Sequence, residues 1–347
     1  MLYYLINYYS LRKVYMSGYR WGVLGTGKIA KRFASALNNI KDEAEFAAIA
    51  SRRRETAEAF AAEYGAAKAY EGYEALVADP DIDIVYVGTP GQCHLKDVTL
   101  ALEAGKHVLC EKALSLNSVE ARQMIELARS KNLFLMEAMW TRFFPVHVKI
   151  RELLAEGEIG DPRGLVANFS AVVPGNPDTD KTRFWDLELG ASALLDIGSY
   201  GIAFGSALFG RPVEVKGVAH VGEAGFDYQN ASVIRYEGGR IASIMASQAS
   251  FDVKTAVIYG TGGRIEIDDP WYKPESMTLV KPGGEPAVYR YPLDGFNGYE
   301  YEIREVSSCL DAGLKESGLV PLDESLDNMK TMDELRNQWG FKFPMEK

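Results

Sequence analysis

A glycine-rich loop, set between a short apolar segment and an amphipathic helix, constrains this fold more than any other feature of the chain. The loop reads G-x-G-x-x-A and consists of Gly25, Thr26, Gly27, Lys28, Ile29 and Ala30. Gly25 permits a tight turn, Gly27 lets the backbone approach an anion, and Ala30 lets the helix pack closely on the strand. We therefore expect the first five loop residues to bind the pyrophosphate of a dinucleotide at the helix N-terminus. A glycine turn without a ligand is the alternative.

The segment from residue 19 to about residue 140 alternates short apolar runs with helical periodicity. Ile29, Phe33 and Leu37 recur every four residues, and Gly65 follows a second amphipathic segment as a helix stop. This alternation is typical of βαβ units, in which helices join parallel strands. We predict a dinucleotide-binding α/β domain of the Rossmann type over 19–142. Its doubly wound parallel sheet has strands at 19–24, 45–50, 84–88, 107–110 and 133–138.

The pattern changes after a helix predicted at 146–156. Strands expected in this second part are 164–173, 213–221, 228–236, 239–250, 254–260, 263–268, 277–281 and 287–291. Tight glycine connections between several of them favour a large, mostly antiparallel open sheet. We predict an α+β domain over 143–347 for substrate binding and dimerisation, with helices near 191–208, 298–314 and 323–338 covering one face of the sheet.

The other face of that sheet is expected to be apolar. Successive strand residues point to opposite faces, so the adjacent pairs Val233-Ile234 and Ile244-Met245 each place one apolar side chain on the face without helices. An apolar face of this kind avoids water. We therefore expect a homodimer formed by two such faces.

Residues 1–18 form an N-terminal extension whose pattern does not continue into the first strand, and we expect Met16 to be the natural start. This extension lacks the charge and cleavage pattern of a signal peptide, and no apolar run reaches the length of a membrane span. Three scattered cysteines, Cys93, Cys110 and Cys309, fit neither a disulfide framework nor a zinc site. These features predict a cytoplasmic protein without a membrane partner.

The net charge argues against nucleic acid as a partner. Thirty-eight Lys and Arg against 48 Asp and Glu give 38 − 48 = −10, a surface that repels phosphate backbones. His107, His147 and His220 show no metal-ligand spacing with Cys, Asp or Glu. We expect a small-molecule ligand and no metal.

The end of the second predicted strand bears on the choice of cofactor. NAD-binding domains usually carry an acidic residue there, which binds the ribose 2′-hydroxyl. Here the strand ends in Ser51, Arg52, Arg53 and Arg54, which offer a hydroxyl and cations to the 2′-phosphate of NADP. We predict NADP, bound by Ser51 and Arg52, with NAD and a merely solvated helix start as the alternatives.

Further motifs make the chain similar to the Gfo/Idh/MocA oxidoreductases, and most similar to their branch of dimeric dihydrodiol dehydrogenases and NADP-dependent D-xylose dehydrogenases. The resemblance begins at about Tyr19 and runs to the end of the chain. It rests on the glycine-rich loop, on 88–90 with His94, on Glu111-Lys112, on 137–145 (EAMWTRFFP) and on 194–200 (LLDIGSY). The run WTRFFP is the most specific of these motifs.

The resemblance implies an oxidoreductase that moves a hydride between nicotinamide and the CH-OH group of a vicinal diol, a dihydrodiol or an aldose. Lys112, Asp196 and Tyr200 are its implied catalytic residues: Tyr200 exchanges the hydroxyl proton, Lys112 holds that hydroxyl and lowers the tyrosine pKa, and Asp196 orients one of them. Lys112 and Tyr200 can also exchange roles. The alternatives are a surface lysine paired with Glu111 and a tyrosine packed at a helix start.

The same resemblance assigns a set of residues to the cofactor, namely Thr89, Pro90, His94, Glu111, Lys112, Trp140 and Arg142. For Trp140 and Arg142 the alternative is packing between domains, and for His94 it is capping or core packing. Arg183 and Trp185 are expected to line the substrate pocket, with a structural loop as the alternative.

Two functional alternatives stay open at this point. One is a regulatory protein that senses a dinucleotide without turnover, and the other is a lyase or glycosidase that uses the bound cofactor transiently. The chain also departs from the family at one position, because Ala113 follows Glu111-Lys112 where the family usually has proline. A cis bond before alanine costs about 2.5–4 kcal/mol, so either the loop is trans here or its surroundings offset that cost.

Overall fold

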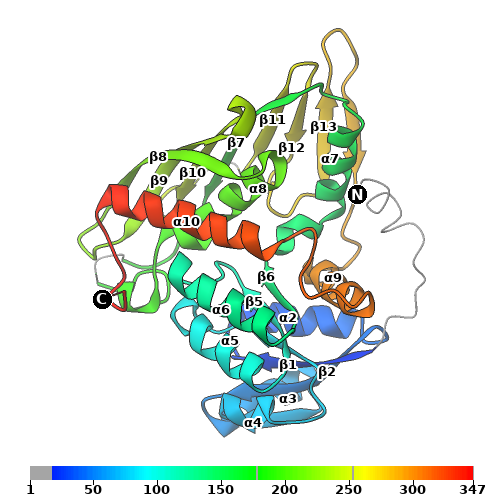
Figure 1. The fold of residues 1–347 in the computed structure, drawn as a ribbon, viewed down its shortest axis with the longest axis vertical. Helices are drawn as coiled ribbons and strands as arrows, with labels where there is room; N and C mark the ends of the chain where they lie inside the picture. Colours follow the sequence, from blue (N-terminus) through cyan, green and yellow to red (C-terminus); the bar gives the residue numbers. More distant parts are fainter. Residues whose placement is uncertain (1–17, 177–178, 252–253, 347) are drawn as a thin grey trace.

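The first sheet is parallel and has six strands. It lies in the lower half of the molecule in Figure 1. The computed structural model describes residues 18–176, 179–251 and 254–346. The strand order β3-β2-β1-β4-β5-β6 is that of a dinucleotide-binding Rossmann sheet, which confirms the predicted fold class. The strands are β1 (Tyr19–Leu24), β2 (Ala44–Ser51), β3 (Lys68–Glu71), β4 (Ile84–Val87), β5 (His107–Glu111) and β6 (Leu135–Ala138).

Helices connect these parallel strands. They are α2 (Lys28–Asn39), α3 (Arg54–Tyr64), α4 (Tyr73–Val77), α5 (His94–Glu103) and α6 (Ser118–Ser130). The period seen in the sequence places Phe33 and Leu37 of α2 in the core, and the Phe33 ring stacks on Tyr86 of β4 with 3.7 Å between ring centroids. β3, α4 and α6 were not among the predicted elements. The carboxyl ends of β1, β2, β4 and β5 lie along one edge of the sheet, where ligands of such sheets bind.

The second sheet has eight strands in the order β14-β13-β12-β11-β7-β10-β9-β8. Its neighbours run antiparallel except β7 and β10, which confirms the predicted mostly antiparallel sheet. The strands are β7 (Pro162–Ser170), β8 (Pro212–Val221), β9 (Asp227–Tyr236), β10 (Ile241–Ser247), β11 (Ala256–Gly260), β12 (Arg264–Ile267), β13 (Ser276–Val280) and β14 (Ala287–Arg290).

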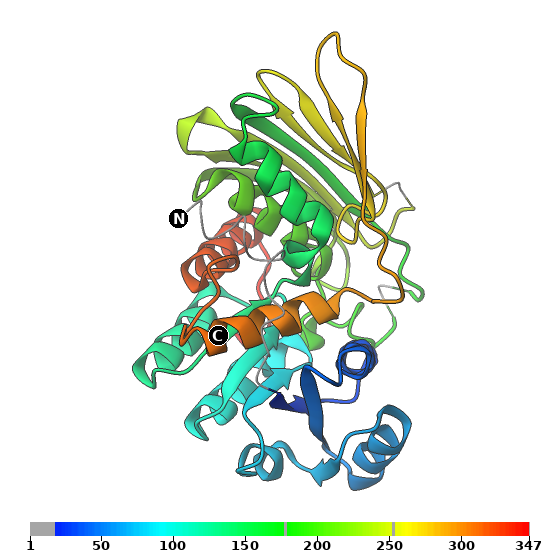
Figure 2. The same cartoon turned by 90° about the vertical axis from the view of Figure 1, so that its right-hand side faces the viewer.

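One face of this second sheet is covered by helices, as Figure 2 shows from the side. α8 (Ser199–Phe209) contacts β7 and β10, and α10 (Leu322–Trp339) contacts β8 as well as α6 of the first domain. α7 (Pro145–Ala155) joins the two sheets along the chain. The prediction for 298–314 was wrong in its position, because α9 (Tyr299–Asp311) packs mainly against α2 and the short helix Trp140–Phe143. Glu300 fixes it there by accepting a hydrogen bond from Asn39 of α2 at 2.7 Å.

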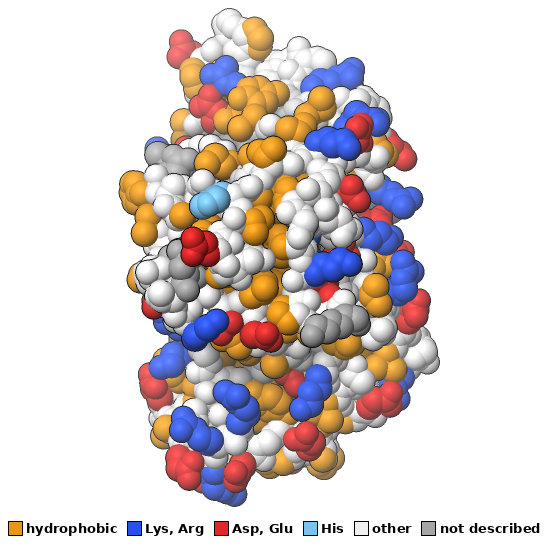
Figure 3. All heavy atoms as spheres, turned by 90° about the vertical axis from the view of Figure 1, so that its left-hand side faces the viewer, with side chains coloured by type: hydrophobic (Ala, Val, Ile, Leu, Met, Phe, Trp, Pro, Cys, Tyr) orange, Lys and Arg blue, Asp and Glu red, His pale blue; other side chains and the backbone are white. Residues whose placement is uncertain are grey.

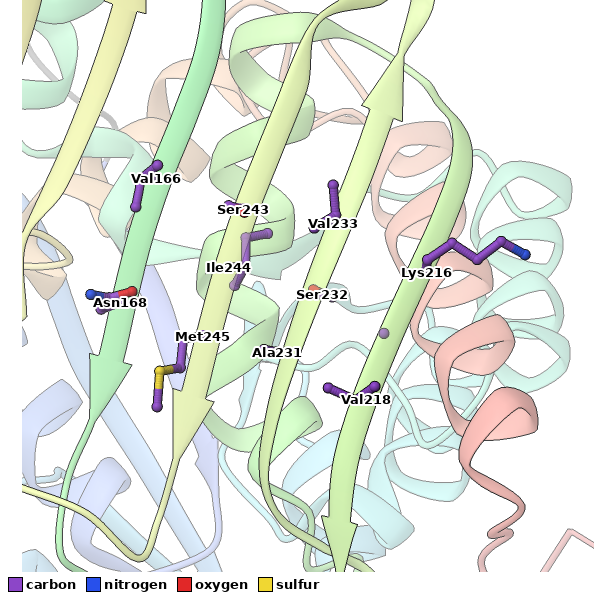
Figure 4. A pocket seen from close by; sticks show the side chains of 11 residues that line it. Val166, Asn168, Lys216, Val218, Ala231, Ser232, Val233, Ser243, Ile244 and Met245 are labelled. Atoms are coloured by element: carbon purple, nitrogen blue, oxygen red, sulfur yellow. The ribbon is translucent and has the colours of Figure 1, made fainter.

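The opposite face of the second sheet carries the apolar side chains expected from the adjacent pairs. Val233 is 46% and Met245 38% exposed, whereas Ile234 is 0% and Ile244 4% exposed. Figure 3 shows hydrophobic side chains gathered on that side of the molecule, between scattered charged ones. Figure 4 shows Val166, Val218, Val233 and Met245 rising from four strands around a shallow hollow of about 470 Å³. The alternation inferred from the sequence is therefore confirmed.

Within the described part of the chain, one stretch is long and apolar enough to cross a membrane by length and composition. It is Leu187–Phe209, and 83% of its most apolar window is buried inside the fold. This burial is what a core helix of a globular domain shows, so the stretch is weak evidence for a span. The expectations for the N-terminal extension and for Met16 fall on residues 1–17, which lie outside the described residues.

Candidate active site

The glycine-rich loop lies at the carboxyl edge of the first sheet. Gly25 has φ +96°, the left-handed conformation that glycine adopts without penalty, and its N–H donates to Ala50 O at 3.0 Å. Gly27 and Lys28 are exposed, and Thr26 and Ile29 are partly exposed. A Cβ added to Gly27 would meet no atom of the described residues within 4 Å, so the space beside this glycine is open. No side chain among the described residues caps the N-terminus of α2 with a hydrogen bond. The loop and the free N–H groups of α2 therefore fit a dinucleotide pyrophosphate.

Two neighbouring strand ends complete this edge. Ser51 is the last residue of β2 and is buried, while Arg52 and Arg53 follow it with exposed side chains. Thr89 and Pro90 follow β4, and the Thr89 hydroxyl donates to Asp97 Oδ2 of α5 at 2.7 Å. Arg52 thus stands next to the loop, free to meet a ligand, whereas the Thr89 side chain is held by the protein.

His94 lies fully buried behind the Thr89-Pro90 turn. Its Nδ1 lies 3.2 Å from the carbonyl oxygens of Ala113 and Leu114, and its Nε2 lies 2.9 Å from Thr89 O. Burial lowers the pKa of His94. Because both ring nitrogens face backbone carbonyls, His94 ties two loops of the site together and has no ring atom left for substrate; this is the packing role kept open above.

Lys112 follows β5 and reaches across to the second domain. Its ammonium donates to the backbone oxygen of Asp196 and lies 3.5 Å from Asp196 Oδ1. Burial disfavours the ammonium, but Tyr200, Asp196 and Glu111 outweigh it and raise the pKa of Lys112. The Lys112–Ala113 peptide bond is cis, although alanine stands in place of proline. Lys112 is therefore a charged donor held at the junction of the two domains.

Asp196 lies in the π-helical turn Leu194–Gly198, where three side chains with donor groups contact it. Besides Lys112, Arg183 Nη1 lies 3.5 Å from Oδ1, and Gln248 Nε2 donates to Oδ2 at 3.1 Å. Burial opposes ionisation, but Lys112 and Arg183 outweigh it and hold the pKa of Asp196 below its usual value. Gln248 was not among the predicted site residues. It lies just beyond β10 and contacts Asp196, although the two residues are 52 positions apart in the chain.

Tyr200 lies in the first turn of α8, about one helical turn after Asp196. Trp140 Nε1 donates to the Tyr200 hydroxyl at 2.9 Å, and Lys112 Nζ lies 4.7 Å from the centre of its ring. Burial raises the pKa of Tyr200, and the Lys112 ammonium and the Trp140 hydrogen bond only partly offset this. Lys112 and Tyr200 lie close together, as predicted, but in the protein alone Tyr200 stays a protonated phenol.

Aromatic rings form a wall beside Tyr200. Tyr272 stacks on Phe169 with 4.2 Å between ring centroids and lies 5.8 Å from Tyr200. Trp140 stacks in turn on Tyr299 of α9 at 4.7 Å. Phe169, Tyr272 and Tyr299 were not among the predicted site residues, because they come from three separate elements whose only sequence signal is apolar character.

A small cavity lies between the Lys112 loop and the turn that carries Asp196. Among the residues that line it are Pro90, Lys112, Arg183, Ser192 and Asp196. The guanidinium of Arg183 stacks 4.0 Å from the Phe184 ring centre and is largely exposed, so it is free to contact a ligand. Arg183 therefore lies where a substrate-lining residue was predicted.

Three predicted site residues point elsewhere. The Arg142 guanidinium donates to Glu324 Oε1 at 2.5 Å and to Leu319 O at 2.6 Å, both in the C-terminal segment. These contacts fit the alternative of packing between domains rather than the predicted contact with the cofactor. Trp185 is buried and donates from Nε1 to Pro174 O at 3.0 Å, packed behind the cavity rather than lining it. Glu111 turns into the core, where its Oε1 accepts a hydrogen bond from the Tyr86 hydroxyl at 2.5 Å.

The arrangement suits exchange of a proton with an alcohol or carbonyl oxygen. Lys112 presents an ammonium and Tyr200 a hydroxyl whose oxygen already accepts from Trp140, so its own proton is available to a ligand. Such a pair stabilises and protonates an oxygen on which negative charge develops. Within the described residues, no group of three or more His, Cys, Asp or Glu side chains gathers to hold a metal ion.

Comparison with known proteins agrees with this geometry. Residues 19–139 match the oxidoreductase family with an NAD-binding Rossmann fold, Gfo/Idh/MocA, and residues 147–266 match the Gfo/Idh/MocA C-terminal domain. The chain is 36% identical to the trans-1,2-dihydrobenzene-1,2-diol dehydrogenase of Bos taurus over 336 residues, covering 94% of this chain and 99% of the relative. It is also 36% identical to the enzyme of that name from Homo sapiens over 338 residues, with the same coverage.

Solved structures with the same fold support the assignment. A 3-ketoreductase from Actinomadura kijaniata, in complex with NADP and TDP-benzene, superposes with a TM-score of 0.81 at 26% identity, covering 92% of this chain and 98% of that one. A levoglucosan dehydrogenase in complex with NADH and levoglucosan shares the fold with a TM-score of 0.85 at 19% identity, covering 93% of this chain and 98% of that one. The parallel sheet, the phosphate loop, the Lys112 and Tyr200 motifs and these full-length similarities show that the chain belongs to the Gfo/Idh/MocA oxidoreductase family, as an NAD(P)-dependent dehydrogenase.

Proposed function

We propose that this dehydrogenase uses NADP and transfers a hydride between nicotinamide and the CH-OH group of a vicinal diol, a dihydrodiol or an aldose. The observation that carries the proposal is the cluster at the end of β5, where Lys112 lies 3.5 Å from Asp196 Oδ1 and 4.7 Å from the Tyr200 ring centre. This cluster lies at the same sheet edge as the phosphate loop, so a bound nicotinamide and a substrate oxygen meet there.

The aromatic wall and the polar cavity support this proposed substrate class. Tyr272 and Phe169 offer stacked ring faces to a flat diol or to the apolar face of a sugar, while Lys112, Asp196 and Arg183 offer polar partners to its hydroxyl groups. The relatives from Bos taurus and Homo sapiens are named for a cyclic dihydrodiol, which agrees with this combination.

When bound, the nicotinamide would accept or supply the hydride, and the protein's own residues handle the proton. In reduction, Lys112 donates a hydrogen bond to the carbonyl oxygen and Tyr200 gives that oxygen its proton. In oxidation, Tyr200 takes the proton back, after its pKa has been lowered by nearby positive charge. Asp196, held by Gln248, keeps the Lys112 ammonium directed into the site.

The preference for NADP rests on Ser51 and Arg52. Arg52 stands exposed at the carboxyl end of β2, the position from which the ribose 2′-substituent is bound in this fold. Its guanidinium supplies a charge-assisted hydrogen bond to a 2′-phosphate, and the second strand carries no carboxylate at its end to repel that phosphate. These features support NADP over NAD.

The experiment that tests the function is reduction of NADP, followed by its absorbance, with a panel of trans-diols, dihydrodiols and aldoses. We expect stoichiometric NADPH with at least one of these classes, and a Tyr200→Phe enzyme whose turnover is about 10²–10⁴-fold lower while cofactor binding is retained. Binding without turnover across the panel would indicate the sensing protein, and product without net NADPH would indicate transient use of the cofactor.

We also propose that the protein is a cytoplasmic homodimer joined through the open face of the second sheet. The exposed side chains of Val166, Val218, Val233 and Met245 support this, because an apolar face of this extent is unfavourable in water (Figure 4). Cys93, Cys110 and Cys309 form no disulfide in the described part of the chain, which suits a reducing compartment. A monomeric mass by light scattering at micromolar concentration would contradict the dimer.

A further inference from the structure

Asp227 is a fully buried carboxyl at the start of β9. Its Oδ1 accepts a hydrogen bond from the Ser192 hydroxyl at 2.5 Å, and its Oδ2 accepts from Leu194 N at 2.8 Å and from Asn230 Nδ2 at 2.7 Å. Burial raises the pKa of Asp227 to about 6, while these hydrogen bonds favour its charged form. At neutral pH the group is therefore a carboxylate with both oxygens bonded to donors.

Two of these donors lie where a helical path starts. The path begins with the π-helical turn Leu194–Gly198 and continues directly into α8. The first N–H groups of a helix have no acceptor within the helix. Here Asp227 accepts the N–H of Leu194, and the Ser192 hydroxyl oxygen accepts the N–H of Leu195 at 3.2 Å. Asp227 and Ser192 therefore cap the start of this path together, where a negative charge is favourable.

The capped path carries Asp196 and Tyr200 to Lys112. Asp196 N donates to Ser192 O at 3.0 Å, so the serine that is bonded to Asp227 also holds the backbone of Asp196. Tyr200 follows four positions later on the same path. Lys112 Nζ lies 3.5 Å from Asp196 Oδ1 and 4.7 Å from the Tyr200 ring centre. A shift of the capped start therefore moves both groups that face the Lys112 ammonium.

Two neighbouring strands of the second sheet hold this path. Asn230, on the same strand as Asp227, fixes the carboxylate through its bond to Oδ2. Just beyond the adjacent strand β10, Gln248 N donates to Tyr228 O at 2.9 Å, and the Gln248 side chain donates to Asp196 Oδ2 at 3.1 Å. The sheet therefore holds the helical path at two points, namely its start and the carboxylate of Asp196.

We propose that Asp227 is a positioning residue for the reaction: by capping the helical path, it sets where Asp196 and Tyr200 stand relative to Lys112. Asp227 is not among the described residues that line the cavity, so it acts through the turn and not on the substrate. The inference rests on the proposed function, because it assigns Asp227 a part in that reaction. A displacement of about 1 Å at reacting groups can lower turnover about 10²-fold, so such a residue has a measurable effect.

The first test removes the cap. In oxidation of the diol, dihydrodiol or aldose that the wild type uses best, Asp227→Ala should lower the maximum kcat by about 10²-fold. NADP binding should stay close to that of the wild type, because the phosphate loop lies in the other domain. Calorimetric titration with NADP also counts the folded protomers, so that kcat is expressed per binding site.

The pH profile separates a change of placement from a mere loss of stability. Asp196 raises the pKa of both Lys112 and Tyr200, so a loosened Asp196 should lower both pKa values. The other charged groups at Lys112, Glu111 and Arg183, are unchanged in the alanine variant. The profile of kcat against pH should therefore shift toward lower pH.

Two further variants separate the cap from the charge, and they keep the test decisive if the alanine variant does not fold. Asp227→Asn removes the charge, but its amide oxygen can accept from Leu194 N and its amide nitrogen can donate to the Ser192 hydroxyl oxygen. It should keep kcat and the pH profile close to those of the wild type. Asp227→Glu keeps the charge but is longer by one methylene, so it should displace the turn and lower kcat.

Asp79→Ala is the matched control. Asp79 is also buried and accepts three hydrogen bonds, from Lys68, Tyr70 and Asp81 N, but it lies near the amino ends of β4 and β5, away from the site. Its kcat per binding site and its pH profile should match those of the wild type.

Three results would overturn the inference. Wild-type kcat in a folded Asp227→Ala or in Asp227→Glu would show that the cap does not place the site residues. A low kcat in Asp227→Asn would show that the charge matters and not the cap. An equal loss of kcat in Asp79→Ala would show that the loss reflects general destabilisation. Absence of turnover by the wild type across the whole substrate panel would instead refute the proposed function itself.

Discussion

Replacing Glu137 by glutamine should stabilise the protein at alkaline pH and leave it unchanged at acidic pH. Glu137 lies on β6, is almost fully buried, and accepts the N–H of Leu114 at 3.1 Å, which helps to fix the loop that carries Lys112. Burial raises its pKa to about 7, and Glu324 raises it further. The Ser325 hydroxyl, the Leu114 hydrogen bond and the charge of Lys112 only partly oppose the change.

Proton linkage gives the direction in which the free energy of unfolding changes with pH. In the unfolded chain Glu137 has its usual pKa of 4.5, so between this value and about 7 the folded protein binds more protons than the unfolded one. The free energy of unfolding therefore falls as the pH rises through this window, and the full loss is present above the folded pKa. A shift of 2.5 units corresponds to about 3 kcal/mol, an order-of-magnitude value.

Glutamine removes this loss because it is neutral at every pH, while its side-chain oxygen still accepts the Leu114 N–H. We expect Glu137→Gln to be more stable than the wild type by up to about 3 kcal/mol at pH 8 and to match it near pH 4.5. Urea unfolding followed by circular dichroism at both pH values measures the difference. Groups that titrate in both proteins cancel in this comparison.

Glu126→Gln is the matched control, since it makes the same change at an exposed position of α6. It should alter stability by less than about 0.5 kcal/mol at either pH. A Glu137→Gln protein that is less stable than the wild type at pH 8 would refute the reasoning, because it would mean that Glu137 is ionised and favourably paired in the fold.

Two further predictions concern the cofactor and the assembly. Arg52→Ala should weaken NADP binding by about tenfold or more and hardly change NAD binding, and equal loss of both in calorimetry would contradict the role of Arg52. Met245→Glu should convert the proposed dimer to monomers, and an unchanged mass by light scattering would exclude this face as the interface.

Most elements of the fold could be predicted because their apolar residues follow a regular period. The helix α2, for instance, buries Phe33 and Leu37 as its spacing requires. The strand β3 escaped prediction because its four residues, from Lys68 to Glu71, are partly exposed at the edge of the sheet and carry no buried run. α9 was predicted as a helix but assigned to the wrong sheet, since periodicity identifies an apolar face and not the surface that covers it.

The candidate site was predictable where one motif carries the chemistry. Lys112, Asp196 and Tyr200 were named from short motifs, and the structure brings all three together. Arg142 was misjudged because its partner Glu324 lies 182 positions further along the chain, and no local pattern reveals that contact. Gln248 was missed for the same reason, since only the folded sheet places it beside Asp196.

The charges around Lys112 determine what the protein can do before a cofactor binds. Asp196, Glu111 and Tyr200 together keep Lys112 as an ammonium, and burial keeps Tyr200 as a phenol. Both groups are therefore protonated, which is the state required to stabilise and protonate a substrate oxygen in reduction. Oxidation requires the opposite state of Tyr200. Under the proposed function, the oxidised nicotinamide would supply the further positive charge, because the Lys112 ammonium alone leaves the pKa of Tyr200 raised. If the proposed function holds, the base therefore becomes available only when the hydride acceptor is in place.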